Sequence, residues 1–375
     1  MRSSPLVSRI AVSLLPAFFL PTNAQSVPGG AYYPGNGAPA AGAYKLIDDY
    51  NPAIFFNKFV FYNDYDPTYG HVQYVNKQTA QQNGYATVSN GNKSALISVD
   101  TTNKWPNGGP GRPAVRLISD NTYTHGLFIL DVAHMPTGCG TWPAYWLLGP
   151  NWPYTGEFDI IEGTATFETS NCDTSVNGNS GCGSLLNGSL IANNYGAGLN
   201  SNGGGVYATE WTSNFVKTWF FPRGTVPASI TNGAPDVTTF GTPTVNQQGP
   251  GCKIDDHFTN MSIIINTDFC GAWAGNVYRN FPDCPQDPSA PSSIDACVNF
   301  VGNNPSYFTQ AYWEINSIKV YQMPLGAQPT SSYSTNKLVN IFHVLIYWTV
   351  DLEVFFDNRL GTDSCYNPSH LPRVE

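Results

Sequence analysis

The stretch Gly156-Glu-Phe-Asp-Ile-Ile-Glu-Gly163 places three carboxylates among large apolar residues, in a sequence that otherwise has the pattern of a buried β-strand. In a regular strand Glu157 and Asp159 share one face, whereas Glu162, five residues after Glu157, points to the opposite face. A β-bulge adds one residue and resets this alternation. We therefore expect a bulge that brings Glu162 to the face of the other two carboxylates.

Two glutamates on one face of a strand can act as a catalytic pair. Their Cα atoms would lie about 13 Å apart at about 3.3 Å per residue, and inward-leaning side chains reduce the gap between carboxyl groups to roughly 5–6 Å. Cleavage of a glycosidic bond with retention of configuration needs an ionised carboxylate and a protonated carboxyl group about 5–5.5 Å apart. Asp159 between them can hydrogen-bond the nucleophile and separate the two pKa values.

Two other interpretations of the carboxylates are a calcium cluster and a solvated acidic strand. A solvated strand conflicts with Phe158, Ile160 and Ile161, because they make the opposite face strongly apolar. A structural calcium ion stays open at this point. The proposed chemistry needs no cofactor, since two carboxyl groups suffice for it.

Tryptophans lie just upstream of the carboxylates. Trp142, Trp146 and Trp152 fall within eleven residues, in Cys139-Gly-Thr-Trp-Pro-Ala-Tyr-Trp-Leu-Leu-Gly149 and the Trp-Pro pair that follows. Core packing accounts for one or two of them. Because aromatic faces pack well against the C–H faces of sugars, we expect these three to include stacking platforms for pyranose rings.

Short alternating apolar stretches recur between turn clusters along the rest of the chain. They contain β-branched and aromatic residues and predict an all-β fold, a two-sheet antiparallel β-sandwich. In residues 312–321 the alternation of apolar and polar residues skips one step. No stretch of 12 or more residues before Met323 has a helical period. The predicted strands include residues 114–118, 126–132, 214–221, 261–265 and 312–321.

Composition restricts the class of protein. The chain has 375 residues, of which 11% are charged and 41% hydrophobic, with 36 Gly and 29 Pro. Few charges exclude a coiled coil, and the apolar content disfavours disorder. Seventeen basic against 26 acidic residues leave a net charge of −9, which would repel a phosphate backbone and argues against nucleic-acid binding. A weakly charged, aromatic-rich protein suits a carbohydrate partner.

The first residues predict secretion. Arg2 and Arg9 precede the apolar run Ile10–Leu20, and Ala24 is a suitable residue before cleavage, so residues 1–24 resemble a signal peptide. A run of eleven residues is shorter than the roughly 20 that span a bilayer. We expect a secreted protein, extracellular or in the cell wall.

Cysteines and sequons agree with that compartment. The eight cysteines predict disulfides, and the absence of a Cys-x-x-Cys pair argues against zinc. Cys172 and Cys182 are expected to form a local disulfide. A Pro/Gly/Asp-rich region with three more cysteines is also expected to be cross-linked: Cys270, Cys284 and Cys297. Sequons that predict glycosylation lie at Asn92, Asn187 and Asn260.

The expected organisation has four parts. Residues 25–43 form a Gly/Pro/Ala-rich lead-in, 44–322 the catalytic domain, and 323–375 a tail without assignment. The tail contains the apolar run Leu338–Val350, which acidic residues interrupt too early for a membrane-spanning helix. We expect no stable membrane insertion.

These motifs resemble glycoside hydrolase family 16, and most closely its fungal endo-1,3(4)-β-glucanases, or laminarinases. The specific part is Gly-Thr-Trp-Pro-Ala-x-Trp, a second Trp-Pro, and Gly-Glu-x-Asp-Ile-Ile-Glu-Gly. The resemblance extends over roughly residues 44–322. Further matching stretches are residues 66–70, 109–116, 202–207, 219–223, 269–275 and 311–315.

The resemblance implies a β-jelly roll with a concave cleft and retention of anomeric configuration. It implies Glu157 as nucleophile, Asp159 as assisting acid and Glu162 as general acid/base. It also places four residues near the substrate: Trp146, Trp152, Trp273 and Arg112. The expected partner is a β-glucan, and we expect a monomer; linkage preference and disulfide pairing stay open.

Two features depart from the family pattern. The family has a strand with a Thr-x-His element soon after the catalytic strand, whereas no His occurs here between His134 and His257. Residues 323–375 also match nothing in the family. The leading hypothesis is a secreted endo-β-glucanase. The alternatives are a non-catalytic glucan-binding protein on the same fold and a cell-wall transglycosylase.

Overall fold

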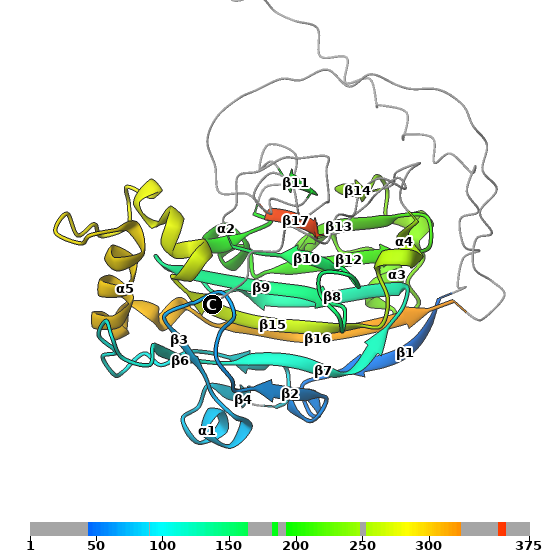
Figure 1. Cartoon of the computed structure of the whole chain (residues 1–375). Coiled ribbons are helices and arrows are strands. Elements are labelled where there is room, and N and C mark those ends of the chain that lie inside the picture. Colours follow the sequence, from blue (N-terminus) through cyan, green and yellow to red (C-terminus); the bar gives the residue numbers. More distant parts are fainter. Residues whose placement is uncertain are drawn as a thin grey trace, which may run out of the picture. The chain divides into compact units, whose positions relative to one another are not determined.

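The computed structural model describes residues 44–89, 91–163, 193–247 and 253–323, and the backbone of 182–186 and 352–357. Over these residues the chain forms two antiparallel β-sheets stacked in layers, with short helices at their ends (Figure 1). The predicted all-β sandwich is confirmed. The signal peptide, the lead-in and the Cys172–Cys182 disulfide lie wholly or partly outside the described residues.

The first sheet is built around β8, which pairs with β12 on one side and β16 on the other. The pairing of β16 with β8 shifts register around Ile315, which is where the sequence alternation skips a step. The skip is therefore a β-bulge that keeps Ile315 and Ile318 in the core. In order, the strands are β14 (Val245–Gln247), β13 (Val216–Pro222), β12 (Gly205–Trp211), β8 (Gly126–His134), β16 (Trp313–Gln322), β5 (Ala95–Ile97) and β4 (Ala86–Val88), and β1 (Lys45–Tyr50) also pairs with β16.

The second sheet contains the strand with the three carboxylates, β10. Its neighbours are β9 on one side and β17, from the tail, on the other. The family strand with the Thr-x-His element, which the sequence suggests is shortened or missing here, would fall on residues 164–181, and these lie outside the described residues. In order, the strands are β11 (Cys182–Leu186), β17 (Leu352–Asp357), β10 (Glu157–Ile161), β9 (Thr141–Leu148), β15 (Met261–Phe269), β7 (Arg116–Tyr123) and β2 (Phe59–Tyr62).

The main core lies between the sheets. Alternate residues of β8 and β15, such as Leu130 and Ile263, are fully buried in one cluster with residues of β10 and β16. Each large apolar side chain buried in this way contributes about 1.5–3 kcal/mol relative to exposure. Period-two alternation in the sequence therefore turns into two sheets with facing apolar sides.

Helices are short, as the lack of helical periodicity predicts. The longest in the described residues is α5, with 11 residues, and the Ser292 side chain caps its first turn by accepting from the Asp295 N–H at 3.0 Å. No helix in the described ranges is long and apolar enough to span a membrane. The helices are α1 (Lys77–Gln82), α2 (Gly196–Ser201), α3 (Ala228–Thr231), α4 (Ile254–His257) and α5 (Ser293–Asn303); η4 (Gly271–Gly275) is a π-helical turn.

Disulfides fasten the region of η4 and α5 to the second sheet. Cys270, at the end of β15, is bonded to Cys297 in α5, and Cys139, before β9, is bonded to Cys284. The predicted cross-linking of this region is confirmed. A small parallel pair, β3 (Val72–Tyr74) with β6 (Arg112–Ala114), lies in the same part of the molecule as α5 (Figure 1).

Candidate active site

The predicted bulge is present in β10. Glu157, Phe158 and Asp159 lie opposite Leu148, Leu147 and Trp146 of β9, and the register then shifts so that Ile161 lies opposite Tyr145. Ile160 is the additional residue. Ile160 and Ile161 are both fully buried, and Glu162 thus follows on the face that carries Glu157 and Asp159.

The two faces of β9 show which side of the sheet is the site. Tyr145 and Leu147 point into the core, whereas Trp142 and Trp146 share the opposite face with the carboxylates. Trp142 donates from Nε1 to Oε1 of Glu162 at 3.1 Å, which places Glu162 on this face directly.

Glycines at both ends of the motif are required by packing. Gly156 has φ of 72°, and a Cβ there would lie 2.3 Å from the Phe258 ring. A Cβ at Gly163 would lie 2.2 Å from the Trp142 indole. Both distances are shorter than any normal contact. The glycines therefore let the chain enter and leave the carboxylate strand against aromatic rings.

An aromatic platform lies beside Glu162. The rings of Trp142 and Trp273 stack with centroids 6.0 Å apart and planes 19° from parallel. Trp142 is almost buried, whereas Trp273, in η4, is 37% exposed. Trp152 is 46% exposed. Trp273 and Trp152 therefore present ring surface to solvent, as a sugar-binding platform requires.

Electrostatics distinguish the two glutamates. Desolvation raises the pKa of both carboxyl groups, and the proximity of Glu162 raises the pKa of Glu157 further. Hydrogen bonds with Asp159 and Trp152 and the charge of Arg116 act in the other direction on the pKa of Glu157. On Glu162 only the Trp142 hydrogen bond does so. Because the charge of one carboxyl group opposes ionisation of the other, the pair loses its two protons in separate steps.

Arg116 is the cation of the site. Its guanidinium lies 5.1 Å from the Trp146 ring and 5.0 Å from the Tyr62 ring, and 92% of the residue is buried. Its Nε has no hydrogen-bond partner among the described residues. A hydrogen bond also fixes the Trp146 ring, since its Nε1 donates to Oδ1 of Asn266 at 2.8 Å.

Arg112, which the resemblance places near the substrate, is instead an internal residue. It is completely buried, lies over the Phe308 ring, and donates to the backbone carbonyls of Asp100 and Val301. A guanidinium enclosed in this way presents no charge to a ligand. The predicted substrate contact of Arg112 is therefore corrected, and Arg116, four residues later, lies among the site residues.

Asn266 and Asp268 lie beneath the site, and sequence reasoning missed both. Both lie on β15, opposite Ala144 and Trp142 of β9, and both are buried. The available signal was their spacing, because two polar residues two positions apart extend an apolar strand and share one face.

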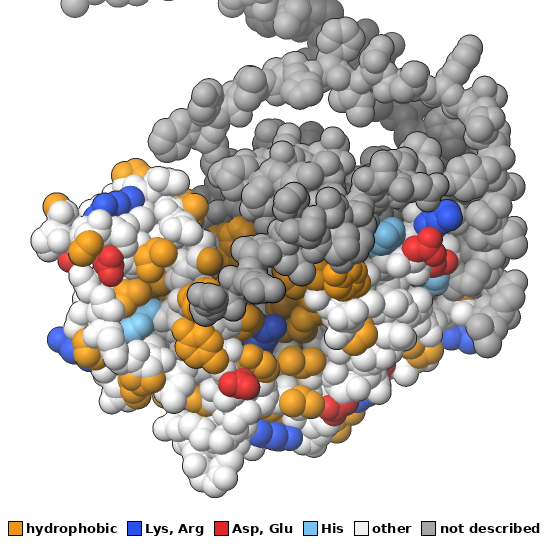
Figure 2. Space-filling view, in the orientation of Figure 1, with side chains coloured by type: hydrophobic (Ala, Val, Ile, Leu, Met, Phe, Trp, Pro, Cys, Tyr) orange, Lys and Arg blue, Asp and Glu red, His pale blue; other side chains and the backbone are white. Residues whose placement is uncertain are grey.

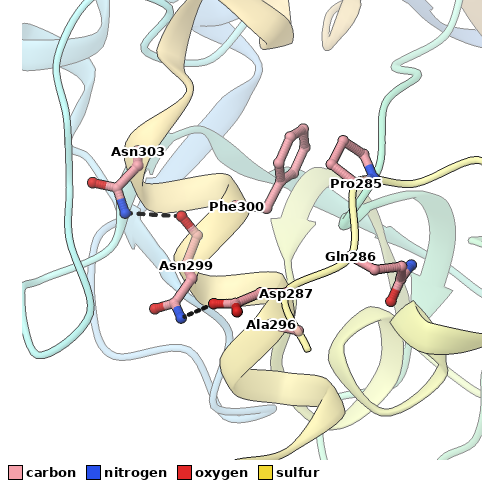
Figure 3. A pocket seen from close by; sticks show the side chains of 7 residues that line it. All are labelled: Pro285, Gln286, Asp287, Ala296, Asn299, Phe300 and Asn303. Carbon is pink, nitrogen blue, oxygen red and sulfur yellow. Dashed lines mark hydrogen bonds between the residues drawn. The ribbon is translucent and has the colours of Figure 1, made fainter. Parts of the chain in front are cut away.

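Figure 2 shows apolar side chains around a hollow with a Lys or Arg side chain in it. A separate pocket of about 390 Å³ opens beside α5 (Figure 3), where Asn299 donates to Asp287 at 3.0 Å and Asn303 to the Asn299 carbonyl at 2.9 Å. Its amides are thus already paired, and none of the predicted site residues lines it. The lining residues are Pro285, Gln286, Asp287, Ala296, Asn299, Phe300 and Asn303.

Comparison with known proteins finds a matching family. A family model described as an XgeA-like, catalytic GH16 domain matches residues 59–169 and 164–321. A protein named "Probable endo-1,3(4)-beta-glucanase" from Aspergillus niger is 43% identical over 315 residues, covering 79% of this chain and 42% of that protein. The chain therefore spans less than half the length of this curated relative.

Two solved structures are similar over about three quarters of this chain. Laminarinase 16A from Phanerochaete chrysosporium, solved with β-glucans in donor and acceptor sites, is 38% identical, with a TM-score of 0.66 over 74% of this chain and 99% of that one. A structure described as an elongating GH family 16 β-1,3-glucosyltransferase is 37% identical, with a TM-score of 0.65 over 74% of this chain and 100% of that one.

Proposed function

Because the chain belongs to glycoside hydrolase family 16, we propose that it is an endo-β-glucanase that hydrolyses β-1,3-linked and mixed-linkage β-1,3/1,4-glucans. The observation that carries the proposal is the bulge in β10, which brings Glu162 to the face of Glu157. The names of the similar proteins support a β-glucan as substrate.

The proposed reaction is a double displacement. Glu157 attacks the anomeric carbon while the bond to the leaving glycosidic oxygen breaks, and Glu162 gives its proton to that oxygen. Glu162 then accepts a proton from water, whose oxygen displaces Glu157 and restores the original configuration. Because the charge of one glutamate opposes ionisation of the other, the pair can supply one ionised nucleophile and one protonated acid, and the family resemblance assigns these two roles.

The remaining residues of the site would hold the sugar and the nucleophile. Asp159, buried between the two glutamates, supports ionised Glu157 through their hydrogen bond. Trp152 and Trp273 offer exposed rings for pyranose faces. The charge of Arg116 acts to lower the pKa of Glu157.

Reducing-end release from laminarin tests the proposal. The wild-type protein is expected to release oligosaccharides, and Glu157→Gln, which cannot form the glycosyl ester, is expected to abolish the release. Asp120→Asn, an exposed acidic position on β7, is a matched control that should retain activity. Unchanged activity of Glu157→Gln would overturn the proposed mechanism.

Transglycosylation is the second candidate, because the glucosyltransferase structure is about as similar as the laminarinase. The two reactions differ only in whether water or a sugar hydroxyl accepts the glycosyl group. Product analysis on laminarin, lichenan and chitin–glucan acceptors separates them: elongated products indicate transfer, whereas short reducing sugars indicate hydrolysis. Binding without either product would support the glucan-binding alternative.

Secretion is part of the proposal. The basic residues and apolar run of residues 1–24 support it, and so do the two disulfides, because such bonds persist in oxidising compartments. N-terminal sequencing of protein from culture medium is expected to begin at Gln25. Retention of the uncleaved chain inside the cells would contradict secretion.

A further inference from the structure

A second pair of carboxyl groups lies next to the aromatic platform and takes no part in the proposed chemistry. Asp66 lies in the loop before β3, and Asp268 lies near the end of β15, separated from it by 202 positions. Both are about 95% buried. The hydroxyl of Thr68 joins them, with Oγ1 2.7 Å from Oδ2 of Asp66 and 2.9 Å from Oδ2 of Asp268.

One hydroxyl proton serves two buried carboxyl groups. A threonine hydroxyl has a single proton and can donate to only one of the two carboxyl oxygens. A proton on one of the two carboxyl groups would satisfy the other short O···O contact. Backbone N–H groups donate to both carboxyl groups, from Gly70 to Asp66 at 2.8 Å and from Phe269 to Asp268 at 2.6 Å.

The surroundings of Asp268 favour its neutral form. Burial and the neighbouring Asp66 raise the pKa of Asp268 to about 8. The Phe269 N–H, the Thr68 hydroxyl and the charge of Arg116 on β7 act to lower it, without cancelling the effect of burial. Tyr74 on β3 is a further titratable neighbour, and burial raises its own pKa well above the ordinary value.

The contact between the loop and β15 is tight. A Cβ at Gly70 would lie 2.0 Å from Oδ1 of Asp268, so the loop backbone packs directly on this carboxyl group. The Thr68 carbonyl accepts from the N–H of Ala272 at 2.9 Å, and the His71 N–H donates to the Phe269 carbonyl at 2.6 Å. The loop is thereby joined to η4, the element that carries Trp273.

A series of contacts connects Asp268 with Glu162, the proposed catalytic acid. Asp268 lies opposite Trp142 in the pairing of β15 with β9, Trp142 stacks on Trp273, and Trp142 donates to Glu162. We propose that Asp268 is a positioning residue. Its proton completes the hydrogen-bonded group of Asp66, Thr68 and Asp268, which we call the latch. Loss of this proton loosens the Trp142–Trp273 platform and weakens glucan binding. The binding of glucan in this statement rests on the proposed function.

Two pH profiles test the latch. Asp268→Asn keeps a donor toward Thr68 but cannot ionise. Between pH 6 and pH 9 the KM of the wild type for laminarin is expected to rise roughly threefold or more, whereas that of Asp268→Asn stays constant. The kcat profile, set by Glu157 and Glu162, is expected to be the same in both. A KM that rises equally in both proteins would overturn the proposal.

Two measurements that need no hydrolysis of glucan test the latch independently of the proposed function. The exciton circular dichroism of the stacked Trp142–Trp273 pair should fade above pH 8 in the wild type and persist in Asp268→Asn.

The native wild type keeps the Asp268 proton up to about pH 8, whereas the unfolded chain loses it near pH 4, so wild-type stability falls across this window. The melting temperature of Asp268→Asn relative to wild type is therefore expected to increase from pH 5 to pH 8.

Thr68 supplies a second pair of variants in case Asp268→Asn does not fold. Thr68→Val removes the bridging hydroxyl and is expected to raise the KM and weaken the exciton signal at every pH. Thr68→Ser keeps the hydroxyl and is expected to retain both wild-type profiles. Wild-type behaviour of Thr68→Val would overturn the latch, and absence of glucan hydrolysis with an intact pH-dependent signal would contradict only the proposed function.

Discussion

At the scale of single residues, the site depends on groups that are costly to place together. Two glutamates share one face of β10, and desolvation raises the pKa of both. Their environments differ, because Asp159, Trp152 and Arg116 favour ionised Glu157 whereas Glu162 has only Trp142. The charge of Glu162 opposes these effects on Glu157, so the two carboxyl groups ionise one after the other, as the proposed pair of a nucleophile and an acid requires.

The pH dependence of hydrolysis follows from this pair. Activity should rise as Glu157 ionises and fall as Glu162 loses its proton. Because the pKa values of the pair are raised to about 7, the optimum pH of hydrolysis is expected above about pH 5. The acidic and alkaline limbs of the profile give apparent pKa values that belong to the coupled pair and not to either glutamate alone.

Glu162→Gln isolates the two limbs of the profile. Its kcat on laminarin is expected to fall by about 10²–10⁴, because the general acid is lost. The alkaline limb should disappear from the residual activity, since glutamine has no proton to lose. An alkaline limb of unchanged position would show that another group is the acid.

Gly163→Ala tests the role of packing around the acid. The added Cβ would displace Trp142, cost about 1–3 kcal/mol of folding free energy and break the hydrogen bond to Glu162. We expect kcat to fall about tenfold, which corresponds to a loss of about 1.4 kcal/mol. Gly224→Ala, where nothing lies within 4 Å, is the control. Equal behaviour of the two variants in stability and kcat would contradict this role.

At the scale of elements, the strand beside β10 comes from an unexpected part of the chain. Glu157, Phe158 and Asp159 pair with Asp357, Phe356 and Phe355 of β17, and β11 pairs with the other edge of β17. The tail that resembled nothing in the family therefore supplies backbone partners to the catalytic strand.

A chain truncated after Met323 should show what β17 contributes. β10 would become an edge strand and lose a few hydrogen bonds, each contributing about 0.5–1.5 kcal/mol. We expect a lower melting temperature and a lower kcat. A chain that ends at Leu360 keeps β17 and should behave like the full chain. Equal stability and activity of all three chains would show that β17 is dispensable.

At the scale of the whole molecule, the disulfides join the aromatic platform to the sheet. The Cys270–Cys297 bond links the end of β15, next to η4, to α5 across 27 positions of sequence. The Cys139–Cys284 bond spans 145 positions and begins just before β9. Both bonds therefore hold the η4–α5 region against the strands that carry Trp142 and Asp268.

Removing the first of these bonds is expected to destabilise the protein. Replacement of Cys270 and Cys297 by alanine together should lower the free energy of unfolding by about 3–4 kcal/mol, from the loop closed by the bond. Denaturant unfolding measures the change. The KM for laminarin should also rise, because η4 carries Trp273; a stability equal to wild type would contradict the role assigned to the bond.

Much of the fold and the centre of the site were predictable because they depend on local patterns. Alternation over five to ten residues predicts strands, and the carboxylate spacing in 156–163 predicts the bulge. The same local argument could not separate Arg112 from Arg116. The two lie four residues apart with equal charge, and only their distant neighbours differ: the Val301 carbonyl for one and Trp146 for the other.

The sequence by itself determined the sandwich, the three carboxylates on one face and the aromatic flank, because each follows from periodicity within a single strand. Tertiary structure alone decided the cation of the site, the Cys139–Cys284 pairing, the place of β17 and the contact between Thr68 and Asp268, 200 positions apart. Such contacts leave no local pattern, since the residues meet only after both sheets have formed.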